Sequence, residues 1–227
     1  MVRFLSQCAA LGMLVVTLPM QLTAADDRIP SCLYGTFTQG EEKAPVEPCL
    51  GDIKNIGMDP HVQAVMRTFN ISRSAVVFSA CPGGRFSAMP AGADDGKRFV
   101  VRYPSTVRSD EYLAPIVHEL AHVVQMRSAG GLAALSPELN SRRIELSADF
   151  LGGLAFNLSL KHLNKGNFET NLQLVGSYNL EPDDHGTPED RTVAFRLGVY
   201  RKEPYSDMTI VEAMNYWSLN DYQRLHR

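Results

Sequence analysis

The stretch Tyr112–Ser128, which reads YLAPIVHELAHVVQMRS, carries the strongest structural signal in this chain of 227 residues. Apolar side chains occur on nearly every side of it, and the pair Gly130-Gly131 follows almost at once. Glycine commonly ends helices, so the pattern predicts one helix that begins near Tyr112 or Pro115 and ends near Ser128. A helix that is apolar almost all round is expected to be buried in a core.

Three polar residues, His118, Glu119 and His122, interrupt this apolar stretch. Positions i and i+4 of a helix lie one above the other, so both imidazoles can reach one zinc ion at about 2.0–2.1 Å. Glu119 is offset from them, so it can take a proton from an attacking water and deliver it to a leaving amine. The alternative is a helix with two partly exposed histidines. Two histidines and a glutamate in a buried helix need polar partners, and a metal ion would supply them, so burial favours the metal site over this alternative.

A second helix is predicted at about Arg142–Leu163, and it contains Glu145 and Asp149. A catalytic zinc takes three protein ligands and keeps one position open, and Glu145 is the expected third ligand. Asp149, one turn further on, is expected to accept the second ring N–H of His118. The alternatives are an ion pair between Glu145 and one of the two arginines before it, and a helix-surface position for Asp149.

The rest of the pattern predicts an α+β protein in which a small N-terminal sheet precedes a helical half. The expected elements are a helix at His61–Phe69, strands at Ala75–Phe78 and Lys97–Tyr103, and helices at Thr187–Tyr200 and Met208–Trp217. Flanking prolines suggest that Lys97–Tyr103 is an edge strand, able to pair with an extended peptide. Residues 164–186 are expected to form a polar loop. Gly152-Gly153 weakens its helix by about 1 kcal/mol per glycine, which indicates close approach by another backbone.

Three blocks of the sequence resemble one group of enzymes: His118–Gln125 (HELAHVVQ), Glu145–Gly153 (ELSADFLGG) and His185–Arg191 (HGTPEDR). HELAH followed by an E-x-x-x-D helix resembles the gluzincin zinc peptidases. The blocks together are most similar to the bacterial neutral zinc metallopeptidases, over about residues 97–200.

The resemblance implies a zincin-like fold and a zinc metallopeptidase activity. It implies that zinc (Zn2+, one ion per chain) is held by His118, His122 and Glu145, and that Glu119 is the general base and acid. The N-terminal third and the C-terminal residues show no such resemblance.

His185 is a further candidate catalytic residue, because a peptidase must stabilise the oxyanion of its tetrahedral intermediate. Tyr178 and Arg191 are alternatives for this role. Equally, His185 can belong to a solvated turn before a helix that Thr187 caps, and Arg191 can be structural, covering Asp149.

Residues 1–25 are expected to be a signal peptide. Arg3 precedes the apolar stretch Ala9–Leu18, and Ala24-Ala25 offers a cleavage site. The apolar stretch is shorter than the roughly 20 residues that span a membrane as a helix, so an uncleaved anchor is the lesser alternative. We therefore expect export to a bacterial periplasm or the medium, with no membrane attachment after cleavage. An extended lead-in at 26–60 and a metallopeptidase domain at 61–227 would follow.

Three cysteines, Cys32, Cys49 and Cys81, remain after the signal peptide. Exported proteins keep disulfides, and the favoured pair is Cys32–Cys49, which leaves Cys81 as the odd thiol.

The composition limits the other possibilities. A net charge of −3 with 44% hydrophobic and 21% charged residues is typical of one globular domain with no general affinity for nucleic acid. The expected partner is a peptide or protein substrate. The alternatives are a non-catalytic envelope protein that keeps a structural zinc site for assembly or binding, and a zinc amidase that acts on a non-protein amide.

Overall fold

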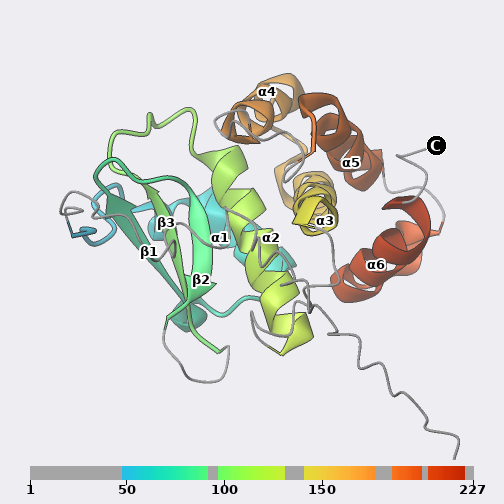
Figure 1. Cartoon of the computed structure of the whole chain (residues 1–227), viewed down its shortest axis with the longest axis horizontal. Coiled ribbons are helices and arrows are strands. Elements are labelled where there is room, and N and C mark those ends of the chain that lie inside the picture. Colours follow the sequence, from blue (N-terminus) through green and yellow to red (C-terminus); the bar gives the residue numbers. More distant parts are fainter. Residues whose placement is uncertain (1–47, 92–96, 131–140, 177–185, 201–203, 223–227) are drawn as a thin grey trace, which may run out of the picture.

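The computed structural model describes residues 48–91, 97–130, 141–176, 186–200 and 204–222. The predicted signal peptide and most of the predicted lead-in lie outside these residues, as do Cys32, Tyr178 and His185. The described part is a mixed α+β structure. A small sheet lies on one side of helix α2 (Leu113–Ala129), and the later helices lie on the other side (Figure 1).

The sheet has the strand order β1-β3-β2, formed by Val76–Cys81, Phe99–Pro104 and Ser87–Pro90. β1 and β3 are parallel, and β2 is antiparallel to β3. The predicted edge position of Lys97–Tyr103 is therefore wrong, because β3 is the central strand. Prolines that flank a strand interrupt no hydrogen bond in its interior, so they do not distinguish an edge from a centre. The edge strand β2 was not predicted, since four residues are too few to show an alternating pattern.

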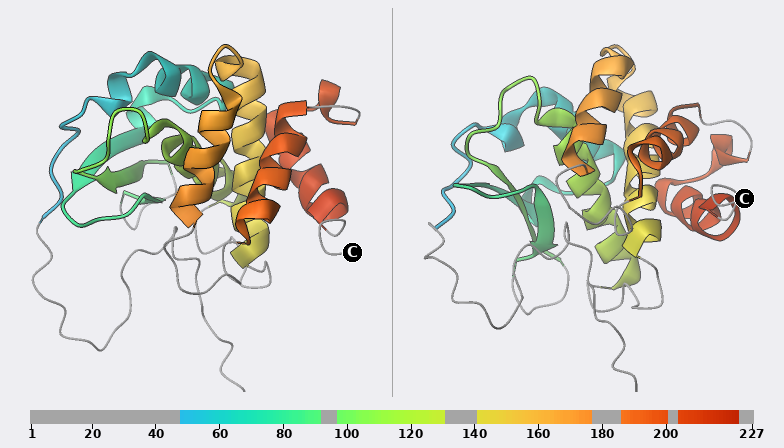
Figure 2. Two further views of the ribbon diagram at one scale, coloured as in Figure 1. Left: turned by 90° about the horizontal axis from the view of Figure 1, so that it is seen from above. Right: turned by 45° about the horizontal axis from the view of Figure 1, so that its top comes forward.

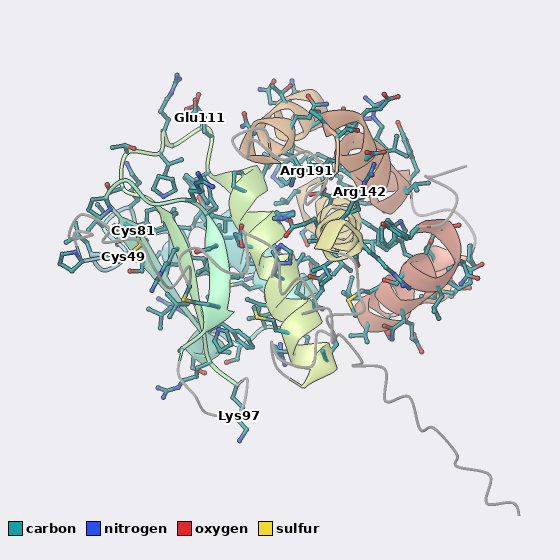
Figure 3. All side chains as sticks on the ribbon, viewed as in Figure 1. Cys49, Cys81, Lys97, Glu111, Arg142 and Arg191 are labelled. Carbon is teal, nitrogen blue, oxygen red and sulfur yellow. A yellow bond between two sulfur atoms is a disulfide. The ribbon has the colours of Figure 1, made fainter. Side chains whose placement is uncertain are left out.

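The outer edge of β1 is covered by the preceding chain and closed by a disulfide between Cys49 and Cys81 (Figure 3). The predicted Cys32–Cys49 pair, with Cys81 as the free thiol, is therefore wrong. The backbone N–H of Leu50 donates to the carbonyl of Ala80 at 2.7 Å, which brings the neighbouring residues 49 and 81 together. A single antiparallel bridge between distant residues leaves no local signal in the sequence.

Six α-helices and several shorter helical turns make up the rest of the described chain. The α-helices are α1 (Pro60–Thr68), α2, α3 (Ser141–Ala155), α4 (Lys165–Gly176), α5 (Pro188–Tyr200) and α6 (Ile210–Tyr216). The shorter turns are Ile56–Met58, Arg73–Ala75, Phe156–Leu160, Tyr205–Asp207 and Trp217–Asp221. The predicted helices are all present, with ends that differ by a few residues.

The prediction of a polar loop at 164–186 is wrong in its first part, where α4 forms. The buried apolar residues described in α4 are Phe168 and Leu172, which lie one turn apart. Phe168 stacks on Phe195 of α5, with ring centroids 5.2 Å apart. Tertiary packing on this narrow apolar stripe, rather than a broad hydrophobic pattern, stabilises the helix.

Helix α2 lies between the two halves of the molecule. In both views of Figure 2 the sheet is on one side and α3 to α6 are on the other. Every residue from Ala114 to Met126 is buried, as the apolar pattern predicts. The helix ends at Gly130, whose φ of 83° is in the left-handed region that favours glycine. No helix among the described residues is long and apolar enough to cross a membrane.

Helices α3 and α5 cross with their backbones in contact. A Cβ atom added to Gly153 would lie 2.0 Å from the carbonyl oxygen of Phe195. A Cβ atom added to Gly198 would lie 2.1 Å from the carbonyl oxygen of Phe150. The close approach expected at Gly152-Gly153 is thus confirmed, and it occurs at Gly153.

Replacing Gly153 with alanine is expected to lower the free energy of unfolding by about 3 kcal/mol or more, because the added methyl group forces the two backbones apart. Gly152→Ala is the matched control, since its Cβ would meet only Val117 Cγ1, at 3.6 Å. That variant should be as stable as the parent or gain up to about 1 kcal/mol of helix propensity. Chemical denaturation checks both. Equal effects of the two substitutions would contradict the crossing.

Candidate metal centre

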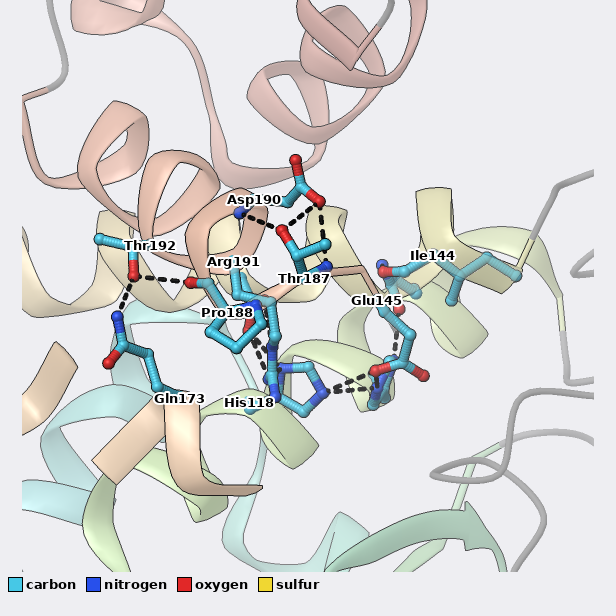
Figure 4. A network of polar contacts seen from close by, with 12 residues as sticks. His118, Ile144, Glu145, Gln173, Thr187, Pro188, Asp190, Arg191 and Thr192 are labelled. Carbon is cyan, nitrogen blue, oxygen red and sulfur yellow. Dashed lines mark hydrogen bonds and ion pairs between the residues drawn. The ribbon is translucent and has the colours of Figure 1, made fainter. Parts of the chain in front are cut away.

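Three helices bring the polar residues of the centre together (Figure 4). α2 supplies His118, Glu119 and His122. α3 supplies Glu145 and Asp149, and α5 supplies Arg191 near its start. The exposed fraction of these side chains is at most 2%. The structure thus collects both predicted imidazoles and all three predicted carboxylates in its buried interior.

Three ligand atoms of the centre lie at the corners of a small triangle. The Nε2 atoms of His118 and His122 are 3.1 Å apart. Oε2 of Glu145 lies 3.0 Å from His118 Nε2 and 3.4 Å from His122 Nε2. Tetrahedral ligands at zinc–ligand distances of about 2.0–2.1 Å are about 3.3–3.4 Å from one another. These three residues therefore form a group that could hold a metal ion.

An acceptor oxygen faces Nδ1 of both histidines, which favours a proton on that atom. His118 Nδ1 lies 2.8 Å from Asp149 Oδ1, a contact expected from the sequence. His122 Nδ1 lies 2.7 Å from Gln125 Oε1, and Gln125 Nε2 donates to the carbonyl of Ile144 at 2.8 Å. This second bond orients the amide, so its oxygen faces the ring and His122 Nδ1 is the donor. In neutral rings both Nε2 atoms, which lie 3.1 Å apart, then carry lone pairs, and a cation between them would stabilise this close approach.

The carboxyl group of Glu145 is ionised in this setting. Burial alone would raise its pKa, but the imidazoles of His122 and His118 outweigh burial and hold that pKa well below its ordinary value. The ion pair with a neighbouring arginine, considered from the sequence, does not form: Arg142 binds Asp190, and Arg143 donates to the carbonyl of Ser218. Glu145 Oε1 has no hydrogen-bond partner among the described residues, so one oxygen remains for a ligand.

Glu119 differs from the other acids of the centre because neither of its carboxylate oxygens has a hydrogen-bond partner in the described structure. Burial raises its pKa to about 8, although His122 and the nearby backbone of Ala88 in β2 act in the opposite direction. Unpaired buried polar groups are rare in folded proteins, and they are found where a ligand or a catalytic water binds. Both oxygens of Glu119 are therefore available to a further group, and the backbone of Ala88 in β2 is their neighbour on the sheet side.

Asp149 is held from the opposite side by Arg191. The guanidinium donates to Asp149 through Nε at 2.7 Å and through a terminal nitrogen at 2.9 Å. That terminal nitrogen is also 3.3 Å from His118 Nδ1. Arg191 thus lies on the Nδ1 side of His118, away from the Nε2 atoms. Of the alternatives considered from the sequence, the structure supports its structural role rather than oxyanion stabilisation.

The start of α5 places Arg191. Thr187 Oγ1 accepts from the N–H of Asp190 at 3.2 Å, and Asp190 Oδ2 accepts from the N–H of Thr187 at 2.9 Å (Figure 4). These reciprocal bonds make Thr187 the N-cap, as predicted. Asp190 also binds Arg142 of α3, so two ion pairs connect the first turn of α5 to α3.

Two parts of the centre were not anticipated from the sequence. Gln125 lies three residues after His122, which is within reach on a helix, so its role had a local signal. Ala88 approaches Glu119 from β2, and only the pairing of the sheet brings it there.

If the centre holds a metal ion, replacing Gln125 with leucine is expected to weaken its binding, tested with zinc, about 10–100-fold, because His122 loses the acceptor that orients its ring. Competition with a chromophoric chelator measures this affinity. Gln63→Leu on α1 is the matched control, since its amide donates to the carbonyl of Gly57, away from the centre. Unchanged affinity in Gln125→Leu would show that this side chain does not support a metal ligand.

The chain was compared with protein-family models, with curated proteins and with solved structures, and no match was found in any of the three comparisons.

Proposed function

We propose that this chain is an exported zinc metallopeptidase that hydrolyses peptide bonds, with Glu119 as general base and acid. One observation carries the proposal. The Nε2 atoms of His118 and His122 and Oε2 of Glu145 face a common point, and the unpartnered carboxylate of Glu119 lies beside them. A purely structural metal site has no use for that additional carboxylate.

Two imidazole nitrogens and one carboxylate oxygen form a donor set that suits zinc and leaves a coordination position open. When bound, zinc supplies Lewis acidity, which acidifies a water and polarises a carbonyl group. Asp149 and Gln125 keep the Nδ1 protons on His118 and His122, so that both Nε2 lone pairs are directed at the metal position. Arg191 holds Asp149 in place.

Glu119 carries the proton transfers in this proposal. Its carboxylate takes a proton from the attacking water and transfers it to the nitrogen of the departing amine. No described side chain competes for its oxygens. The water-poor surroundings strengthen its interaction with the charges that develop in the reaction. His185 and Tyr178 stay candidates for oxyanion stabilisation, and they lie outside the described residues.

Strand β2 is the element that we assign to substrate alignment. It pairs with β3 on one side only within the described sheet, and its Ala88 backbone is near Glu119. An extended peptide that pairs with this open edge would bring its carbonyl groups along α2. β2 thus takes the role that the sequence suggested for Lys97–Tyr103.

Two further observations support the proposal. The Cys49–Cys81 disulfide suits an oxidising compartment, in agreement with a signal peptide at residues 1–25 and a periplasmic or secreted location. The arrangement of a small sheet, a central helix with His118 and His122, and a third ligand from the next helix agrees with a zincin-like fold.

Glu119→Gln is expected to retain one zinc ion per chain and to lose about 10²–10⁴-fold in cleavage rate, because the amide cannot accept the proton of the water. The measurement is cleavage of a diverse peptide library, with zinc content determined on the same samples. Glu111→Gln is the matched control, since Glu111 is a surface residue far from the centre (Figure 3). It should cleave like the parent.

Zinc-loaded parent protein that cleaves no peptide would overturn the peptidase proposal. The remaining explanations would then be a binding protein that keeps its metal or an amidase with a non-protein substrate. Equal cleavage by parent and Glu119→Gln would instead reject Glu119 as the general base.

A further inference from the structure

A cavity of about 440 Å³ lies at the junction of α2, α3 and α6, outside the metal centre. Its size is within the roughly 300–1,000 Å³ of ordinary small-ligand pockets. Its walls are mostly apolar, and Leu219 at its rim is 68% exposed. The apolar lining residues described are Ala129, Ile144, Val211, Met214 and Leu219.

Two unsatisfied donors lie in this apolar setting. Ser147 is 2% exposed, and its hydroxyl has no hydrogen-bond partner in the described structure. Nε of Arg143 is likewise buried without a partner. Arg143 and Ser147 are four residues apart on α3, so they lie next to each other on one helix face. Buried donors without an acceptor are unfavourable, and a ligand that supplies the acceptor would relieve this.

The charge of Arg143 indicates what kind of acceptor fits. One of its terminal nitrogens donates to the carbonyl of Ser218, and its guanidinium lies over the ring of Tyr222 at 5.7 Å. No aspartate or glutamate is among the described residues that line the cavity.

We propose that this cavity binds an apolar monocarboxylate, which is either an alkyl carboxylic acid or the free C-terminus of an apolar peptide. The carboxylate accepts from Arg143 Nε and from the Ser147 hydroxyl, and the apolar part packs on Ile144, Met214 and Leu219. A carboxylate can accept both bonds at once and neutralises the guanidinium, whereas a neutral apolar molecule would leave both donors unsatisfied.

The site is separate from the catalytic group but adjacent to it. Gln125 lines the cavity, and its Oε1 accepts from His122 Nδ1. The inference does not depend on peptidase activity, because binding is measured without turnover.

The test is a titration of the zinc-loaded full chain with decanoate below its micelle concentration. Isothermal calorimetry measures the affinity, and the fluorescence of the single tryptophan, Trp217, reports the site because its neighbour Ser218 lines the cavity. We expect one decanoate per chain, bound at least tenfold more tightly than the neutral analogue decanol. A second arm compares an apolar tripeptide that has a free C-terminus with its amide, which distinguishes the two sources of the carboxylate.

Ser147→Ala and Arg143→Met should each weaken the binding of the carboxylate at least tenfold and weaken decanol binding much less, because the single hydroxyl of decanol is an uncharged acceptor. Ser147→Ala removes only an unpaired hydroxyl, so it is the variant expected to keep the fold intact. Arg67→Met on α1, outside this cavity, is the matched control for the lost positive charge and should bind like the parent.

Three results would overturn the proposal. One is failure of both carboxylates to bind. Another is equal affinity for the charged and neutral forms. The third is carboxylate binding that neither Ser147→Ala nor Arg143→Met weakens and that is lost when zinc is removed. The carboxylate would then be a ligand of the metal.

Discussion

The charge balance of the buried centre is the constraint on which the rest of the structure depends. Glu119, Glu145 and Asp149 are fully buried, and Arg191 is the buried cation that faces them. Near neutral pH the raised pKa of Glu119, about 8, keeps that acid protonated. With Glu145 and Asp149 ionised and both imidazoles neutral, these groups then sum to −1, and ionising Glu119 as well makes the sum −2. Unbalanced charge in a protein interior is strongly unfavourable. A divalent cation held between the two imidazoles and Glu145 would offset this negative charge and favour ionisation of Glu119, which would bring the sum to zero. The same metal that would support catalysis would therefore also stabilise the core.

The helical half is arranged so that this balance can form. Arg191 reaches Asp149 only because α5 crosses α3 at backbone contact, with glycines at positions 153 and 198. A side chain at either position would separate the helices and lengthen the bidentate ion pair. The pair in turn orients Asp149 towards His118. Packing at one crossing therefore determines the electrostatics of a site on a third helix.

The sheet contributes from the other side of α2. It covers the apolar face of the helix, and its edge strand β2 passes next to Glu119. The result is an acid that is buried yet adjacent to a strand that pairs on one side only within the described sheet. This combination of a proton acceptor and a backbone that can align a peptide underlies the proposed peptidase activity. It arises from the position of one four-residue strand.

By itself, the sequence determined the features that follow from local geometry. The apolar stretch with its terminal glycine specified α2, the i and i+4 spacing placed His118 and His122 on one side, and Thr187 marked the start of α5. The tertiary structure decided what depends on contacts between distant residues. These are the partner of Cys49, the central position of β3, the existence of α4 on so few apolar contacts, and the place of Arg191 behind Asp149. Helical periodicity repeats within a few residues and is visible in the chain, whereas strand order, disulfide pairing and helix crossing follow from how the whole core packs.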